Sequence, residues 1–330
     1  MLNNLFRESK LHFEICTNQN EWNRFLEKTN IARADYTYES LHYHLAAAKK
    51  EHNLKLQLIK LIDNKNTVGI FPLFSENNNK LFGKKNIVSP LFFKNLPVSL
   101  EDKINKELKL ILISYAKLSG LENIILSEKS INNEPSSWIK NFMDEKATFE
   151  IFFDLYINLQ LSIEKIKNNL RKSYKSLVNS KDLDIRVMDY SNLNIEIWNN
   201  FKNLHFKLSK RKTRNDDTWD IQYNNIKNNK SFLIYTKFKN KVIGANYVGY
   251  SKDEANYGSS AILKNFNNKL GHTLKFETIK HCKKLGLMWY NLGLHYFNSN
   301  DSELRNISDF KKGFATNILP RYKIKVNLKK

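Results

Sequence analysis

Two pairs of apolar segments with the same layout occur along the chain. In the first half, residues 56–62 and 68–74 are rich in β-forming side chains and flank a polar turn. In the second half, residues 232–238 and 242–248 flank a similar turn at 239–241. Apolar runs joined by a short turn of Asn and Lys are typical of antiparallel strands, so the pattern predicts two β-hairpins.

Each predicted hairpin is followed by a helix and then by a strand. The spacing of apolar residues predicts helices over 104–119 and 270–285, which end at Gly120 and Gly286. Glycine directly after the last periodic position is the usual left-handed stop of a helix. A short apolar segment follows each glycine. The same order of hairpin, helix and strand in both halves predicts a duplicated α/β unit.

The residues between the two repeats predict a helical insertion at about 161–230. We expect a first domain over 1–150 and a second over 151–330, with the insertion inside the second. The first helix of the insertion combines an apolar stripe with a basic face, which is either a solvated surface or a surface for an RNA phosphate backbone. The stripe consists of Ile163, Ile166, Leu170, Tyr174 and Leu177, and the basic face of Lys165, Lys167, Arg171, Lys172 and Lys175.

The strongest compositional signal is the net charge. The 330 residues include 54 Lys and Arg against 33 Asp and Glu, which gives a net charge of +21. Such a surface attracts polyanions, among them RNA, nucleotides, coenzyme A and anionic lipids, although lysine also serves solubility alone. A hydrophobic content of 41% with 12% aromatic residues excludes disordered and fibrous chains.

Cysteine usage and hydropathy indicate the compartment. Cys16 and Cys282 lie far apart with no metal-binding spacing, which argues against a zinc site and a disulfide framework. No run reaches the roughly 18 apolar residues that span a bilayer, and the N-terminus lacks the apolar core of a signal peptide. We expect a cytoplasmic protein with at most peripheral contact with an anionic membrane and no DNA partner.

Five short motifs lie in order along the second half of the chain. They are Leu170-Arg-Lys-Ser-Tyr-Lys175, His205 followed by Lys210-Arg-Lys-Thr-Arg214 and Thr218-Trp219, Ala255-Asn-Tyr-Gly258, Gly286 followed by Tyr290-Asn-Leu-Gly293, and Phe310-Lys-Lys-Gly-Phe314. Their order and spacing resemble the FemAB-type transferases, which build or decorate cell-envelope polymers. The resemblance implies an α/β (α+β) fold of two tandem GNAT-like domains. It also implies transfer of an aminoacyl or acyl group to an amine of a peptidoglycan or polysaccharide precursor, including nucleotide-linked ones.

The resemblance leaves two donors open, aminoacyl-tRNA and acyl-CoA, neither held as a tightly bound cofactor. A GNAT that binds coenzyme A usually has a glycine-rich loop at the start of its central helix, where backbone N–H groups bind the diphosphate. Here Gly271 is the one glycine of that loop that remains, and His272 follows it. This departure weakens the acyl-CoA alternative, an N-acyltransferase acting on an amino sugar or amino acid. A non-catalytic protein that binds RNA or a membrane surface is the other alternative.

Lys311 is the first catalytic candidate. A predicted C-terminal helix places Leu304, Ile307 and Phe314 on one apolar arc, and Lys311 falls inside that arc. A buried ammonium needs an anion, unless its stem packs while its head reaches water. The family resemblance implies that the pair Phe310–Lys311 is linked to activity, with the lysine facing phosphate or developing negative charge.

Further candidates come from the other motifs. Arg211 and Arg214, with Lys172, suit phosphate groups, and the alternative for this basic segment is an exposed loop. Tyr257 in a predicted strand is either a hydrogen-bond donor to the reacting carbonyl or a core residue. His295 after a predicted strand is either a base near neutral pH or a structural residue. We expect no metal site, and direct aminolysis without a covalent enzyme intermediate.

Overall fold

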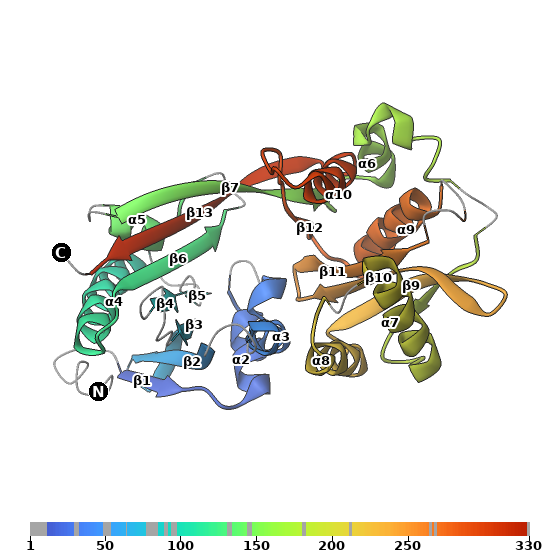
Figure 1. Ribbon diagram of the computed structural model, residues 1–330. Helices are drawn as coiled ribbons and strands as arrows, with labels where there is room; N and C mark the ends of the chain where they lie inside the picture. The colour runs from blue at the N-terminus through green and yellow to red at the C-terminus, as the bar shows by residue number, and fades with distance from the viewer. Residues whose placement is uncertain are drawn as a thin grey trace. The chain divides into compact units, whose positions relative to one another are not determined.

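The computed structural model describes residues 12–29, 33–48, 54–63, 65–76, 85–88, 92–93, 98–130, 134–143, 147–179, 183–210, 213–263, 266 and 269–328. The chain groups into two compact units, coloured along the chain in Figure 1. The first consists of Met1–Ala32, Tyr36–Phe153 and Leu319–Lys330, and the second of Arg33–Asp35 and Asp154–Ile318. The C-terminal segment therefore groups with the first unit, which no local sequence pattern indicates.

The first unit contains a sheet with the strand order β1-β2-β3-β4-β6-β13, and β5 pairs with β3. The hairpin predicted in this half is confirmed as β2 and β3. Its strands are β1 (His12–Ile15), β2 (Leu54–Asp63), β3 (Asn66–Glu76), β4 (Lys85–Val88), β5 (Phe92–Phe93), β6 (Asn123–Lys129) and the C-terminal part of β13 (Asn317–Asn327). Its helices are α2 (Gln19–Leu26), α3 (Tyr38–Ala48), α4 (Val98–Leu118) and α5 (Ser137–Met143).

Helices cover both faces of this sheet. Successive strand residues point to opposite sides, so neighbouring residues pack against different helices. Ile59 and Phe71 pack with α4 and α5, whereas Leu58 and Ile70 pack with α2 and α3. Helix α4 stops before Gly120, whose φ of +64° is the left-handed conformation that the sequence predicts.

The second unit contains the strand order β7-β12-β11-β10-β9-β8. The second predicted hairpin is confirmed as β9 and β10, and β11 and β12 are parallel neighbours. The strands are the C-terminal part of β7 (Ala147–Asn158), β8 (Ile185–Met188), β9 (Ser231–Phe238), β10 (Lys241–Tyr250), β11 (Glu254–Ile262) and β12 (Trp289–Leu294). The helices are α6 (Ile163–Asn169), α7 (Ile195–Ser209), α8 (Asp216–Lys227), α9 (Leu270–Lys284) and α10 (Ser302–Lys312), with a 3-10 turn η2 (Lys172–Tyr174); another, η1 (Ala34–Tyr36), lies near the N-terminus.

The core of the second unit also has two layers. Phe232 and Ile234 of β9 pack in the cluster that contains α9, whereas Leu233 and Tyr235 pack in the cluster that contains α7 and α8. This double cover explains why six successive residues of β9 are buried.

Two details of the predicted insertion are wrong. The helix expected through Leu177 ends at Asn169, because Leu170 is extended and the N–H of Arg171 donates to the carbonyl of Gly313 at 2.9 Å. The insertion is not wholly helical, since the short strand β8 pairs with β9. The side chain that caps α8 belongs to Asn215, and it accepts a bond from the N–H of Thr218 at 3.1 Å.

Candidate functional site

The site lies where two parallel strands separate. β11 and β12 pair over three residue pairs, which end at Asn256 and Asn291. Both strands continue beyond this point, β11 to Ile262 and β12 to Leu294. Tyr257 is therefore the first residue of β11 beyond the paired region. Carboxyl ends of separating parallel strands are where α/β proteins place ligands.

A β-bulge on each strand shapes this point. Between β10 and β11, Val248 faces Tyr257 and Tyr247 faces Ser259, so Gly258 is the extra residue. A Cβ at Gly258 would lie 2.6 Å from the ring of Tyr247, which explains the glycine. A β-bulge changes the direction of the side chains next to it, and Tyr257 is directly next to this bulge.

The second bulge lies between β12 and β7. Asn291 faces Tyr156 and Gly293 faces Leu155, so Leu292 is the extra residue. Gly293 has a φ of +93°, a conformation that L-residues rarely adopt. Each of the two diverging strands therefore carries a bulge next to the point where they separate.

Two lysine amines meet at Tyr257. The Nζ of Lys311, from α10, lies 4.4 Å from the centre of the Tyr257 ring. The Nζ of Lys275, from α9, lies 3.8 Å from the same centre and 3.4 Å from the Oη of Tyr290. A Cβ on Gly293 would lie 3.6 Å from the Lys311 Nζ, so this glycine forms part of the wall beside that amine.

Burial changes the charge of both amines. It lowers the pKa of Lys311 to about 8, so most of this lysine is protonated at neutral pH. Burial, and then the charge of Lys311, lower the pKa of Lys275 well below its usual range. Burial also raises the pKa of the Tyr257 hydroxyl, against opposing effects of Ser260 and Arg214. The Lys311 cation therefore lies beside Tyr257 and beside Lys275, whose neutral form is favoured by burial and by the Lys311 charge.

Arg214 lies near the same tyrosine. Its guanidinium packs on the ring of Trp219 at 4.9 Å, and its Nη1 donates to Gln222 at 3.3 Å. Burial and the charge of Arg214 lower the pKa of His205 to about 4, so this histidine is neutral. Trp219 holds the Arg214 guanidinium in place.

The start of α9 is covered by aromatic side chains. The ring of Tyr174 lies 4.4 Å from His272 and 5.9 Å from Phe310, measured between ring centroids. A Cβ on Gly271 would lie 3.8 Å from the Cζ of Phe310. Gly271 and His272 thus pack against the chain's own apolar groups, which is a poor fit to a coenzyme A diphosphate.

The remaining predicted residues lie apart from the two amines. The Nδ1 of His295 is 2.7 Å from the Oγ of Ser308, and burial and Lys312 lower its pKa. Lys172 is exposed on η2. Arg211 lies outside the described residues. The structure therefore brings together Lys311 and Tyr257, with Phe310, Gly271 and His272 as one adjoining cluster.

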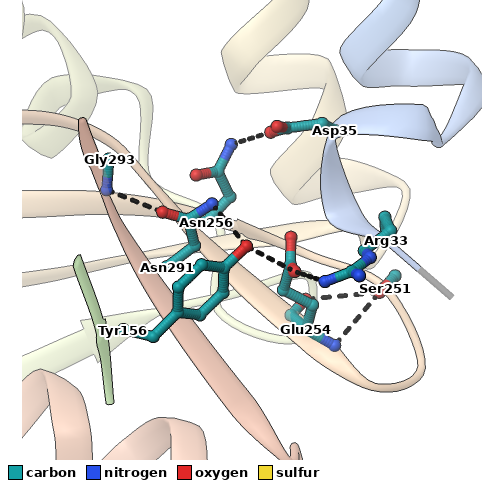
Figure 2. Close-up of polar contacts among 8 residues, drawn as sticks. All are labelled: Arg33, Asp35, Tyr156, Ser251, Glu254, Asn256, Asn291 and Gly293. Atoms are coloured by element: carbon teal, nitrogen blue, oxygen red, sulfur yellow. Dashed lines mark hydrogen bonds and ion pairs between the residues drawn. The ribbon is translucent and has the colours of Figure 1, made fainter. Parts of the chain in front are cut away.

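The sequence interpretation missed Lys275. This lysine is 2% exposed and lies in line with three buried residues of α9, Thr278, Ile279 and Cys282. Spacings of three, four and seven residues put it on the apolar stripe of the helix, and that signal was present in the sequence. Also missed was a buried polar network around Glu254 and Tyr156, shown in Figure 2.

Within the described ranges, no three His, Cys, Asp or Glu side chains gather as metal ligands would. No helix in this part of the chain has the length and hydropathy of a membrane span.

Comparison of the structure with solved proteins decides the fold. FemX superposes with a TM-score of 0.70 at 11% sequence identity, over 94% of this chain and 96% of FemX. A tandem GNAT protein from the clavulanic acid biosynthesis pathway superposes with a TM-score of 0.51 at 9% identity, over 97% and 99% of the two chains. The chain has the tandem GNAT fold.

The tandem GNAT fold is shared by other proteins. L-PGS from Bacillus licheniformis has a TM-score of 0.54 at 12% identity, over 80% of this chain and 82% of L-PGS. No family model matches the sequence, and no curated protein matches it. The predicted fold class, two GNAT-like α/β halves in tandem, is confirmed by these likenesses.

Proposed function

We propose that this chain is a transferase that moves an aminoacyl group from aminoacyl-tRNA to an amine of a cell-envelope precursor. The tandem GNAT fold shared with FemX and the motif resemblance to FemAB-type transferases support the reaction class. The observation that carries the proposal is the half-buried Lys311 amine beside Tyr257. No carboxylate of the described residues forms an ion pair with this amine, so the position suits an anionic reactant.

The chemistry is an aminolysis. The neutral amine of the acceptor attacks the ester carbonyl of the donor, the new C–N bond forms and the ester C–O bond breaks. The proton that the amine loses passes to the leaving ribose oxygen, so the products are an amide and an alcohol. The Lys311 cation stabilises negative charge on the carbonyl oxygen or on a donor phosphate. The N–H of Gly293 is not available for this, because it donates to the Oδ1 of Asn291 at 2.7 Å.

Two observations support aminoacyl-tRNA as the donor. The aromatic cover on the start of α9 leaves Gly271 packed against Phe310 instead of open to a diphosphate. Lys165, Lys172 and Lys175 are exposed on α6 and η2, and none forms an ion pair within the described part of the chain. Exposed cations of this kind bind phosphodiester backbones. Since charged tRNA is intracellular, we place the reaction in the cytoplasm.

The test is transfer of a labelled amino acid from charged tRNA to amine-bearing envelope precursors, with and without RNase. Removing one electrostatic stabiliser costs roughly 100- to 1000-fold in turnover, so we expect that loss in Lys311→Met. Lys312→Met is the matched control, because Lys312 is the exposed neighbour on the same helix. Unchanged turnover in Lys311→Met would overturn the assignment. RNase-resistant turnover that needs acyl-CoA would establish the N-acyltransferase alternative.

A further inference from the structure

A buried polar network lies on the face of β11 and β12 away from α9. The Glu254 side chain is fully buried, and its Oε2 accepts bonds from the Oη of Tyr156 and the Nη1 of Arg33, both at 3.3 Å. The Oη of Tyr156 in turn accepts from the Nδ2 of Asn291 at 3.1 Å, and the Oδ1 of Asn291 accepts from the N–H of Gly293 at 2.7 Å. Figure 2 shows the chain of polar contacts that links Arg33 to Gly293.

The negative charge of Glu254, at one end of the network, determines which group donates in each hydrogen bond. A carboxylate paired with Arg33 only accepts hydrogen bonds, so Tyr156 gives its single proton to Glu254. The Tyr156 oxygen can then only accept, which turns the NH₂ of Asn291 toward it. The carbonyl oxygen of Asn291 is left facing Gly293, where it binds the N–H of the bulge. Tyr156 is thus the residue through which Glu254 determines which way the Asn291 amide points.

The network ends at the wall beside the Lys311 amine. The hydrogen bond that the Gly293 N–H donates to Asn291 fixes Gly293 in its left-handed conformation, and the position of a Gly293 Cβ is 3.6 Å from the Lys311 Nζ. Tyr156, Asn291 and Glu254 are all buried, so loss of one partner would leave a donor or acceptor unpaired away from water and would favour rearrangement of the bulge.

We propose that Tyr156 is a positioning residue. Its hydrogen bonds to the Glu254–Arg33 pair and to Asn291 orient the Asn291 amide, whose oxygen binds Gly293 and so holds the bulge against the Lys311 amine. The role of Lys311 in transfer belongs to the proposed function, but the position of its amine does not depend on that function. The two claims therefore need separate measurements.

The test compares Tyr156→Phe with Tyr235→Phe. Tyr235 is also a buried strand tyrosine of the second unit, and its neighbours are Arg186 and Asp184 rather than the network. Competitive labelling of lysine amines with traces of isotopic acetic anhydride, followed by peptide mass spectrometry at rising pH, gives the titration of Lys311. We expect the Lys311 midpoint to move upward by about one pH unit in Tyr156→Phe, because the freed bulge lets the amine reach water. It should not move in Tyr235→Phe.

Transfer kinetics and a second variant complete the test. Tyr156→Phe should lower kcat more than it changes KM. The alkaline side of its pH–rate profile should shift in the same direction as the Lys311 titration. If Tyr156→Phe does not fold, Glu254→Gln serves, since it removes the charge that orients the network and should move the midpoint in the same direction. An unchanged Lys311 titration in the folded variant overturns the inference. A displaced titration in a protein without transfer activity leaves the inference standing and rejects the proposed function.

Discussion

Replacement of Lys311 by methionine should stabilise the second unit, although we expect the same change to lower transfer activity. Burial lowers the pKa of this amine from 10.5 to about 8. Because one pKa unit corresponds to about 1.4 kcal/mol, keeping the amine protonated costs about 3 kcal/mol of folding free energy at neutral pH. Methionine keeps most of the apolar stem and carries no charge. The neutral side chain also removes the charge that lowers the pKa of Lys275.

The stability difference between Lys311→Met and the native sequence should depend on pH. The unfolded chain holds the Lys311 proton up to pH 10.5, whereas the folded chain loses it near pH 8. Between these values the unfolded state binds more protons, so the stability of the native sequence rises with pH. The advantage of the methionine variant is therefore largest below pH 8 and disappears near pH 10.5.

The assay is native-state amide hydrogen exchange of α9 and β11 against pH. A single unfolding midpoint is not suitable, because the chain contains two compact units. Lys312→Met is again the control, since its exposed amine makes no comparable contribution. The reasoning is refuted if Lys311→Met is less stable than the native sequence at neutral pH, or if the difference between them is the same at every pH.

Two further predictions concern stability. Gly313→Ala should destabilise the second unit by about 1–3 kcal/mol, measured by native-state hydrogen exchange of β9 and β10, because its Cβ would overlap the Tyr174 ring. Gly249→Ala has room, with its nearest neighbour at 3.9 Å, so equal effects of the two changes would contradict this explanation. Asp301→Ala should loosen α10 by about 1 kcal/mol, since Asp301 accepts bonds from the N–H groups of Glu303 and Leu304. Hydrogen exchange of α10 measures this loss, and Asp301→Asn should restore most of it.

Local patterns predicted the repeated plan well. The two hairpins and the helices that end at Gly120 and Gly286 depend on residues close in sequence, which periodicity and glycine positions report. The helix through Leu177 was wrong because Arg171 bonds to Gly313, which is far away along the chain. Periodicity carries no information on such a contact.

The candidate site also depends partly on local patterns and partly on contacts between residues far apart along the chain. Lys311 was selected because it shares an arc with Leu304 and Ile307, yet these are 38% and 44% exposed. Its amine lies instead against Tyr257 of β11, a contact that helix periodicity cannot predict. The bond between Tyr156 and Glu254 joins residues that are 98 positions apart, so no spacing rule could have paired them.

The contacts of the segment before η2 affect how its basic residues should be substituted. Arg171 donates through its Nη2 to the carbonyl of Asp309 at 3.0 Å, and its guanidinium packs on Tyr174 at 5.1 Å. Removing Arg171 would therefore disturb the last turn of α10, which carries Lys311, as well as remove a charge. Lys172 and Lys175 are exposed and make no such contacts in the described structure. A charge-reversal series meant to map a polyanion path should start with these two lysines and leave the arginine intact.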